Sequence, residues 1–384
     1  MKVLVLGGDG YLGWPTAMSL AVAGYEVAIV DNMVKRFWEA ESGVEPLFPI
    51  STLQTRVNTF ERITGNKIKL YIGDISSNHR FVYTTFEDFL PDAVVHYAEQ
   101  PSAPFSMMNR ETCYETQRNN VLGNINVMYA IKKYVPDCHI VKLGTMGEYG
   151  TPNIDIEEGW LNVTHNNRND RVLYPKKPHS FYHLTKVHDS HNLEFGCRNW
   201  GLKVTDLNQG VVYGFSTPET DLDSKLATSF HYDHIFGTVL NRFIVQAILG
   251  VPLTIYGEGT QTRPALNIND TISCIKLALS NPANSGEFRV FNQFTESFKV
   301  KNLAETVVQA AKQQGIQSSI KNIQNPRTEL MDHYYNAKNT SLLDLGLSPT
   351  YLSADLVSTM IKDCLPFRDR VNSDVIQPTI KWSI

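Results

Sequence analysis

The feature that constrains this chain most is a glycine-rich loop directly after its first predicted strand. The apolar run Lys2–Leu6 has the character of a short buried strand, and Gly7-Gly8-Asp9-Gly10-Tyr11-Leu12-Gly13 follows it at once. The loop opens an amphipathic segment, Tyr11–Ala23, that predicts a helix. Glycines at this spacing permit a tight turn and let backbone N–H groups approach a pyrophosphate at the helix N-terminus. A glycine triplet alone also fits a plain surface turn.

Short apolar strands alternate with helices through the first half of the chain. The predicted strands are Lys2–Leu6, Glu26–Val30, Lys67–Ile72, Ala93–Tyr97, His139–Leu143 and Lys203–Leu207. The predicted helices between them are Tyr11–Ala23, the region Asn119–Lys133 and His179–Asn199, with Val34–Thr64 as an inserted loop containing helical pieces. This alternation is typical of parallel βαβ units, so we predict an α/β fold with a doubly wound, Rossmann-like parallel sheet. After Tyr213 the alternation loosens, which predicts a second, smaller lobe with helices near Thr238–Leu249 and Asn302–Gln314.

The composition excludes several classes of protein. A net charge of −4 and a pI near 6.3 argue against a nucleic-acid or membrane-surface binder. No apolar run reaches the roughly 18 residues that a membrane span needs. The five cysteines are widely spaced and form no CxxC pair, which is typical of reduced thiols in a cytoplasmic protein. His188 and His191 lack a second cluster to complete a tetrahedral ligand set, so we predict no metal site.

The second predicted strand ends in an acid that favours NAD over NADP. A carboxylate at Asp31 accepts hydrogen bonds from the adenosine ribose and repels a 2′-phosphate. Lys35 and Arg36 soften this preference, because cations beside Asp31 could tolerate a phosphate. Asp74 follows the third strand and is either near the adenine or a turn-forming acid. The residues we expect to bind NAD are Gly7, Gly10, Tyr11, Leu12, Asp31, Asn32, Arg36, Asp74, Ile75, Asn119 and Lys186.

Tyr182 and Lys186 stand four positions apart and therefore share one face of a predicted helix. A phenol has an unperturbed pKa of about 10, too high for a base at neutral pH. A neighbouring ammonium stabilises the phenolate, so we expect Lys186 to lower the pKa of Tyr182. Thr145, at the end of the fifth predicted strand, could hold a substrate alcohol beside Tyr182. The alternative is an amphipathic helix with a lysine that merely covers apolar surface.

These features together resemble the extended short-chain dehydrogenase/reductase family, whose members modify nucleotide sugars. The resemblance rests on the glycine loop, Asp31, Thr145, Tyr182-x-x-x-Lys186 and Gln209-Gly210-Val211-Val212-Tyr213-Gly214. It implies an NAD-binding domain over residues 1–213, to which later segments return, and a mainly nucleotide-sugar-binding lobe over residues 214–384. It also implies a homodimer packed through helices. The expected substrate contacts are Gln100, Thr145, Tyr182, Gln209, Arg263 and Arg327.

The loop after Thr145 indicates which reaction is catalysed. Dehydratases of this family place an Asp-Glu pair directly after the threonine, whereas this chain has Met146 and Gly147, with Glu148 one place later. The runs 144–159, 180–192 and 205–214 instead resemble the sulfosugar-forming branch of the family. That branch implies oxidation of UDP-glucose at C4, loss of water across C5 and C6, addition of sulfite at C6 and re-reduction at C4. Pro101 stands where plant members have a basic residue, so no sulfite contact is carried over there.

Thr145, Tyr182 and Lys186 are the expected catalytic core, and Glu148 or His183 is expected to move the C5 proton or the departing hydroxyl. Glu148 could instead cap the loop, and His183 could be a polar neighbour of the catalytic pair. We place the enzyme among the hydrolases of sulfolipid or glycan synthesis in the cytoplasm, where a sulfur-donor protein could assist. The alternatives are a UDP-sugar 4-epimerase, a 4,6-dehydratase or an idle NAD-binding regulatory protein.

Overall fold

The central element of the fold is a seven-stranded, fully parallel sheet. The computed structural model describes residues 1–325, 334–380 and 382. The strand order is β12-β8-β5-β4-β1-β2-β3. The strands are β1 (Lys2–Leu6), β2 (Glu26–Asp31), β3 (Ile68–Ile72), β4 (Ala93–His96), β5 (His139–Thr145), β8 (Lys203–Gln209) and β12 (Phe288–Gln293). The predicted doubly wound parallel sheet is confirmed.

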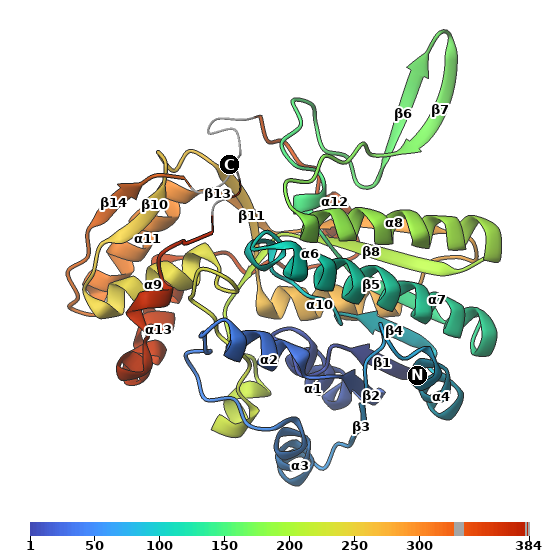
Figure 1. Ribbon diagram of the computed structural model, residues 1–384, viewed down its shortest axis with the longest axis horizontal. Helices are drawn as coiled ribbons and strands as arrows, with labels where there is room; N and C mark the ends of the chain where they lie inside the picture. The colour runs from blue at the N-terminus through green and yellow to red at the C-terminus, as the bar shows by residue number, and fades with distance from the viewer. Residues whose placement is uncertain (326–333, 381, 383–384) are drawn as a thin grey trace.

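Helices cover both faces of this sheet because its strands are apolar on both sides. Val3 and Val5 of β1 belong to one buried cluster, while Leu4 and Leu6 belong to another. Side chains alternate along a strand, so the two clusters lie on opposite faces. The first face is covered by α1 (Gly13–Val22), α3 (Leu53–Thr64) and α10 (Ile268–Ser280). The second is covered by α4 (His79–Phe89), α7 (Gly123–Tyr134) and α8 (Phe181–Trp200), which can be followed in Figure 1.

The later part of the chain forms a further cluster beside the carboxyl end of the sheet. Its helices are α9 (Val239–Leu249), α11 (Val300–Gln313) and α13 (Ala354–Cys364), drawn at the left of Figure 1. β10 (Leu253–Tyr256) pairs with β14 (Ile320–Ile323), and β11 (Thr262–Asn267) lies between β9 (Val211–Tyr213) and β13 (Glu296–Lys299). β12 follows α9, β10 and β11 in the chain yet pairs with β8 at the edge of the large sheet, so the chain returns to this sheet before α11 and α13 are formed. The predicted division at residue 213 stays a prediction.

Three local features differ from the sequence prediction. The predicted helix 119–133 begins with a π-helical turn, η1 (Arg118–Leu122), before α7, and such turns often lie at functional sites. The first helix starts at Gly13 rather than Tyr11, because the preceding residues form the turn of the glycine loop. A hairpin of β6 (Trp160–His165) and β7 (Arg168–Leu173) was not predicted, although Asn166 and Asn167 adopt the left-handed backbone that its tight turn requires. Figure 1 shows this hairpin projecting from the rest of the chain.

The remaining elements are short. They are α2 (Val34–Glu41), α5 (Ala103–Ser106), α6 (Arg110–Gln117), η2 (Met146–Glu148), η3 (Thr220–Leu222), η4 (Ser224–Leu226), α12 (Thr340–Asp344), η5 (Leu365–Arg370) and η6 (Ser373–Val375). Since α2 and α3 occupy residues 34–64, the prediction of an insert with helical pieces is correct. Among the helices of the described residues, none is both long enough and apolar enough to cross a membrane.

Candidate active site

A cavity of about 480 Å³ opens at the carboxyl ends of β1, β2 and β4. Its wall includes nine of the predicted cofactor residues: Gly7, Gly10, Tyr11, Leu12, Asp31, Asn32, Arg36, Ile75 and Asn119. The loop is too tight for side chains: a Cβ at Gly7 would lie 2.7 Å from the carbonyl carbon of Tyr97, and one at Gly13 only 2.0 Å from the Gly7 oxygen. The backbone can therefore approach a ligand closely, as a pyrophosphate at the start of α1 requires. The cavity fits a dinucleotide.

The charges around Asp31 fit NAD better than NADP. Asp31 accepts the backbone N–H groups of Asp9 (2.8 Å) and Met33 (2.6 Å). Burial, together with the nearby Asp9, raises the pKa of Asp31 to about 6. Arg36 donates two hydrogen bonds to the Asp9 carboxylate, at 2.6 and 2.8 Å, and Lys35 pairs with Glu39. Arg36 and Lys35, the two cations that could have bound a 2′-phosphate, are therefore already paired with carboxylates.

Asp9 and Arg56 form a buried ion pair that the sequence did not predict. Arg56 is fully buried, donates to Asp9 Oδ1 at 2.9 Å and lies 4.6 Å from the ring centroid of Trp14. The pair ties the insert helix α3 to the glycine loop. Asp9 and Arg56 are too far apart in the sequence for a local pattern to predict their contact. The one feature that could have indicated an ion pair here is the acid, Asp9, inside a glycine loop.

The geometry of this structure does not favour two of the predicted contacts, which stay predictions. Asp74 does not line the cavity; its Oδ1 accepts the backbone N–H and the hydroxyl of Ser76, both at 2.7 Å, so it is the turn-forming acid of the alternative interpretation. Gln100 is fully buried and reaches neither cavity. Its amide nitrogen donates to Thr116 Oγ1 (2.9 Å) and to the carbonyl oxygen of Ser102 (3.0 Å). The amide nitrogen of Gln100 is therefore already hydrogen-bonded within the protein and is not directed at a substrate.

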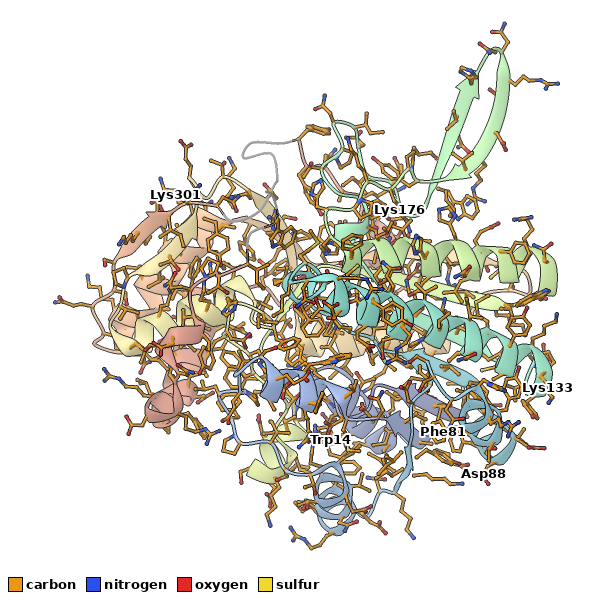
Figure 2. All side chains as sticks on the ribbon, in the orientation of Figure 1. Trp14, Phe81, Asp88, Lys133, Lys176 and Lys301 are labelled. Carbon is orange, nitrogen blue, oxygen red and sulfur yellow. The ribbon has the colours of Figure 1, made fainter. Side chains whose placement is uncertain are left out.

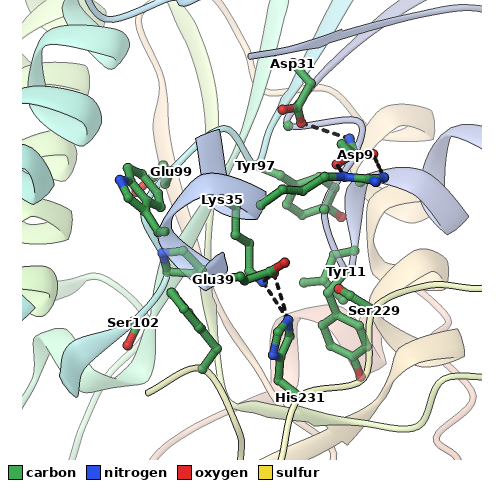
Figure 3. Close-up of a pocket in the computed structure, with 18 of the residues that line it drawn as sticks. Asp9, Tyr11, Asp31, Lys35, Glu39, Tyr97, Glu99, Ser102, Ser229 and His231 are labelled. Atoms are coloured by element: carbon green, nitrogen blue, oxygen red, sulfur yellow. Dashed lines mark hydrogen bonds and ion pairs between the residues drawn. The ribbon is translucent and has the colours of Figure 1, made fainter. Parts of the chain in front are cut away.

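A chain of polar contacts joins α2 to the loop opposite, across the wall of the large cavity. Glu39 Oε1 lies 2.8 Å from His231 Nε2, and His231 Nδ1 lies 3.0 Å from Asp233 Oδ2. Lys35 also contacts Glu39 and His231. Figure 3 shows Lys35, Glu39 and His231 meeting within the cavity. We call these four residues the latch.

Breaking the latch is expected to speed the release of NAD. Glu39→Gln removes the carboxylate that holds both Lys35 and His231, and a hydrogen bond to a charged group contributes about 1.5–3 kcal/mol. Release of bound NAD after dilution, measured on ultrafiltered samples, should accelerate roughly tenfold or more. Glu41→Gln, an exposed position on the same helix, is the matched control. Equal release rates for the two variants would contradict a role for the latch in holding the cofactor.

A second cavity, of about 220 Å³, adjoins the first. Its wall includes the predicted residues Thr145, His183, Gln209 and Arg263, together with Met146 and Gly147. Gln209 lines both cavities, and Tyr182 lines the larger one. Five of the predicted catalytic and sugar-binding side chains, Thr145, Tyr182, His183, Gln209 and Arg263, thus line one or both of two cavities that share Gln209. Arg327 lies outside the described residues.

Lys186 lies beside Tyr182, but its charge is paired with a carboxylate. Its ammonium donates to the Leu143 carbonyl oxygen at 2.7 Å, forms an ion pair with Glu99, and lies 5.7 Å from the Tyr182 ring centroid. Burial, followed by the carboxylates of Glu99, Glu148 and Asp189, raises the pKa of Tyr182 above its ordinary value. The expected lowering is not seen in this structure, because burial raises the pKa of Tyr182 most and the carboxylate of Glu99, which the sequence did not single out, raises it further.

Glu148 is a buried structural carboxylate in this structure. Thr145 and Glu148 form a capping box: Glu148 accepts the Thr145 backbone N–H at 3.3 Å, and Thr145 Oγ1 accepts the Gly147 N–H at 3.1 Å. Glu148 is fully buried and pairs with Lys176, labelled in Figure 2, while Lys142 Nζ lies 4.0 Å away. Burial alone would raise the pKa of Glu148, but Lys176 and Lys142 outweigh it and lower the pKa. Glu148 lines neither cavity, whereas His183 does.

This combination of fold and site defines an NAD-dependent enzyme of the nucleotide-sugar type. The chain belongs to the NAD dependent epimerase/dehydratase family, whose model matches residues 3–292. Within that family it groups with the UDP-sulfoquinovose synthases. It is 51% identical to the chloroplastic UDP-sulfoquinovose synthase of Spinacia oleracea, over 99% of this chain and 79% of that protein. It is 43% identical to the UDP-sulfoquinovose synthase of Sulfolobus acidocaldarius, over 100% of this chain and 98% of that protein.

A solved structure confirms the fold. The UDP-glucose 4-epimerase of Thermus thermophilus in complex with NAD superposes with a TM-score of 0.67 at 22% identity, over 97% of this chain and all of that chain. The resemblance to the sulfosugar-forming branch is confirmed, and NAD is the cofactor. The placement among hydrolases is wrong, because the matching family is defined by epimerase and dehydratase chemistry rather than by hydrolysis.

Proposed function

We propose that this protein synthesises UDP-sulfoquinovose from UDP-glucose and sulfite. The observation that carries the proposal is that Gln209 lines both cavities, with Tyr182 in the wall of the larger one and Thr145 and His183 in the wall of the smaller one. We place the sugar ring beside Gln209, between the cofactor and the proton-transfer groups. The names of the relatives reported above support UDP-sulfoquinovose as the product.

The first stage is oxidation of the sugar at C4. When bound, NAD supplies the chemistry of removing a hydride from C4 and later returning it. Thr145 Oγ1 accepts the Gly147 N–H, which leaves its own proton for the sugar 4-hydroxyl. Tyr182 takes the proton of that hydroxyl and gives it back at the end. Lys186, held by Glu99 and the Leu143 carbonyl, supplies a fixed positive charge beside Tyr182.

The second stage exchanges the C6 hydroxyl for a sulfonate. A ketone at C4 makes the C5 proton acidic, so a base can remove it while the C6 hydroxyl leaves as water. Sulfite then forms a carbon–sulfur bond at C6, and a proton returns to C5 as the C5–C6 double bond is consumed. We assign the proton transfer to His183, which lines the smaller cavity beside Thr145 and whose Nδ1 lies 3.0 Å from Ser180 Oγ. The burial of Glu148 favours His183 over it.

We further propose a homodimer that packs through the helices of one sheet face. Large apolar side chains stay exposed on that side: Tyr114 of α6, Leu122 of η1, Tyr129 of α7 and Phe195 of α8 are each 46–56% exposed. Such a patch is typical of a surface that another subunit covers.

We also propose a cytoplasmic location, which the five free thiols support. The involvement of a sulfur-donor protein stays a prediction.

The proposed function is tested by incubating the protein with UDP-glucose and NAD, with and without sulfite, and identifying the products by mass spectrometry. A UDP-hexose in which a hydroxyl has become a sulfonate, formed only with sulfite, is the expected result. An epimerised or keto-deoxy UDP-sugar formed without sulfite would overturn the proposal in favour of a 4-epimerase or a 4,6-dehydratase. Retained NAD with no change in UDP-glucose would favour the idle binding protein.

A further inference from the structure

Gly147 occupies a position at which any side chain would collide with His183. A Cβ built on Gly147 would lie 2.4 Å from both Cδ2 and Nε2 of the imidazole, and 2.9 Å from Cε1. Unbonded carbon and nitrogen atoms do not approach this closely. The ring of His183 therefore fills the space that a side chain at position 147 would need.

The imidazole is held in this place from its other side. Ser180, the N-cap residue of α8, accepts the His183 backbone N–H at 3.2 Å, and its Oγ lies 3.0 Å from His183 Nδ1. The ring also packs against Tyr182, with 5.1 Å between the ring centroids. Gly147 and His183 both line the smaller cavity beside Thr145. A ring displaced by a new side chain would lose its contact with Ser180.

Gly147 differs from its two glycine neighbours in what it permits. A Cβ at Gly144 would meet the buried Asn208 Oδ1 at 2.2 Å, and Gly150 needs a positive φ of 67°. Gly147 has no positive φ, so an alanine suits its backbone, and the three nearest atoms in its way all belong to one side chain. Of the three glycines in this loop, Gly147 is thus the one whose missing side chain leaves space that an imidazole fills. Its backbone conformation does not itself require glycine.

We propose that Gly147 is a specificity-determining, positioning residue. Because position 147 has no side chain, the imidazole of His183 can lie in the wall of the sugar cavity. The proton transfer at C5 and C6 is then carried out by His183 on α8 and not by a residue of the loop after Thr145. The inference rests on the proposed function, since it concerns the elimination and sulfite-addition stage. It predicts that a substitution at position 147 slows this stage and leaves the oxidation at C4 nearly unchanged, because Thr145 and Tyr182 carry out that oxidation.

The test is Gly147→Ala, followed through the two stages separately. Single-turnover formation of reduced nicotinamide absorbance, with UDP-glucose and no sulfite, reports oxidation at C4. Mass spectrometry with sulfite reports the sulfonated product. Oxidation should stay within about threefold of the unchanged protein, while product formation falls roughly a hundredfold, the usual size of a general acid–base contribution. Unchanged product formation, or an equal loss of both stages, would overturn the inference.

A double variant separates this inference from the role assigned to His183. If alanine at 147 acts by displacing the imidazole, Gly147→Ala should have no further effect in a His183→Ala background. Equal losses in both backgrounds would show that Gly147 acts by another route, while the role of His183 stands. Full product formation by His183→Ala alone would instead remove His183 from the proposed function, and the inference with it. Circular dichroism of each variant checks that a loss is not one of folding.

Discussion

Glu148→Gln is expected to lower the free energy of unfolding by about 3–5 kcal/mol, because breaking a buried ion pair leaves uncompensated charge. Lys142 and Lys176 would then face a neutral amide in a region from which solvent is excluded. Ser190 Oγ, which lies 3.2 Å from Glu148 Oε2, would lose one of its two carboxylate partners and keep Asp206 at 2.7 Å. Urea unfolding followed by circular dichroism measures the loss. Glu157→Gln, a partly exposed acid on the following segment, is the matched control and should stay within about 1 kcal/mol.

This variant also decides between the two roles that the sequence left open for Glu148. The folded state lowers its pKa, so its stabilising contribution is present above the ordinary pKa of a glutamate and is lost as pH falls through the lowered value. Glu148→Gln should therefore remove part of the acid sensitivity of the fold. A Glu148→Gln variant that is as stable as the unchanged protein at every pH, yet inactive, would support a role for Glu148 in moving the C5 proton or the departing hydroxyl.

Glu99→Gln should move the acidic limb of the pH–rate profile toward lower pH. The carboxylates of Glu99, of Glu148 on η2 and of Asp189 on α8 all raise the pKa of Tyr182, after burial itself. Lys186 is the cation beside the phenol, and His183 packs on its ring. Removing the charge of Glu99 frees the positive charge of Lys186 to favour the phenolate. On that limb the rate should rise roughly tenfold for each unit by which the pKa falls.

The measurement is the initial rate of UDP-glucose oxidation across the stable pH range. Asp137→Asn, which removes a fully exposed carboxylate, controls for net charge alone. In a Lys186→Met background, Glu99→Gln should shift the limb less, because the cation that it unmasks is gone. A Glu99→Gln profile that keeps its position and only falls in height would show that Glu99 matters for structure and not for the titration of Tyr182.

The features predicted correctly from the sequence are those set by local pattern. Alternating apolar strands and amphipathic helices identify a parallel sheet, and the glycine loop lies between β1 and α1 and lines the large cavity. The spacing of Tyr182 and Lys186 puts both on one helix face, as predicted, because it depends only on helical geometry.

The errors concern properties that only the assembled structure determines. The pKa of Tyr182 depends on its burial and on Glu99, which comes from a different strand end. Gln100 looks like a binding residue in the sequence, but its amide is consumed by neighbours on a separate helix. The pairing of Asp9 with Arg56 joins segments 47 positions apart, which no local pattern encodes.

The contacts that join the insert and the loop opposite in the wall of the large cavity have a consequence for the living cell. The proposed reaction returns at its last step the electrons that it removed at its first, so a bound NAD never needs to be exchanged for a fresh one. Arg36 and Arg56 fix the glycine loop and Glu39 pairs with His231, so we expect NAD to stay bound from one turnover to the next. The rate of sulfosugar synthesis would then follow the supply of sulfite and UDP-glucose and would be insensitive to the ratio of oxidised to reduced NAD around it.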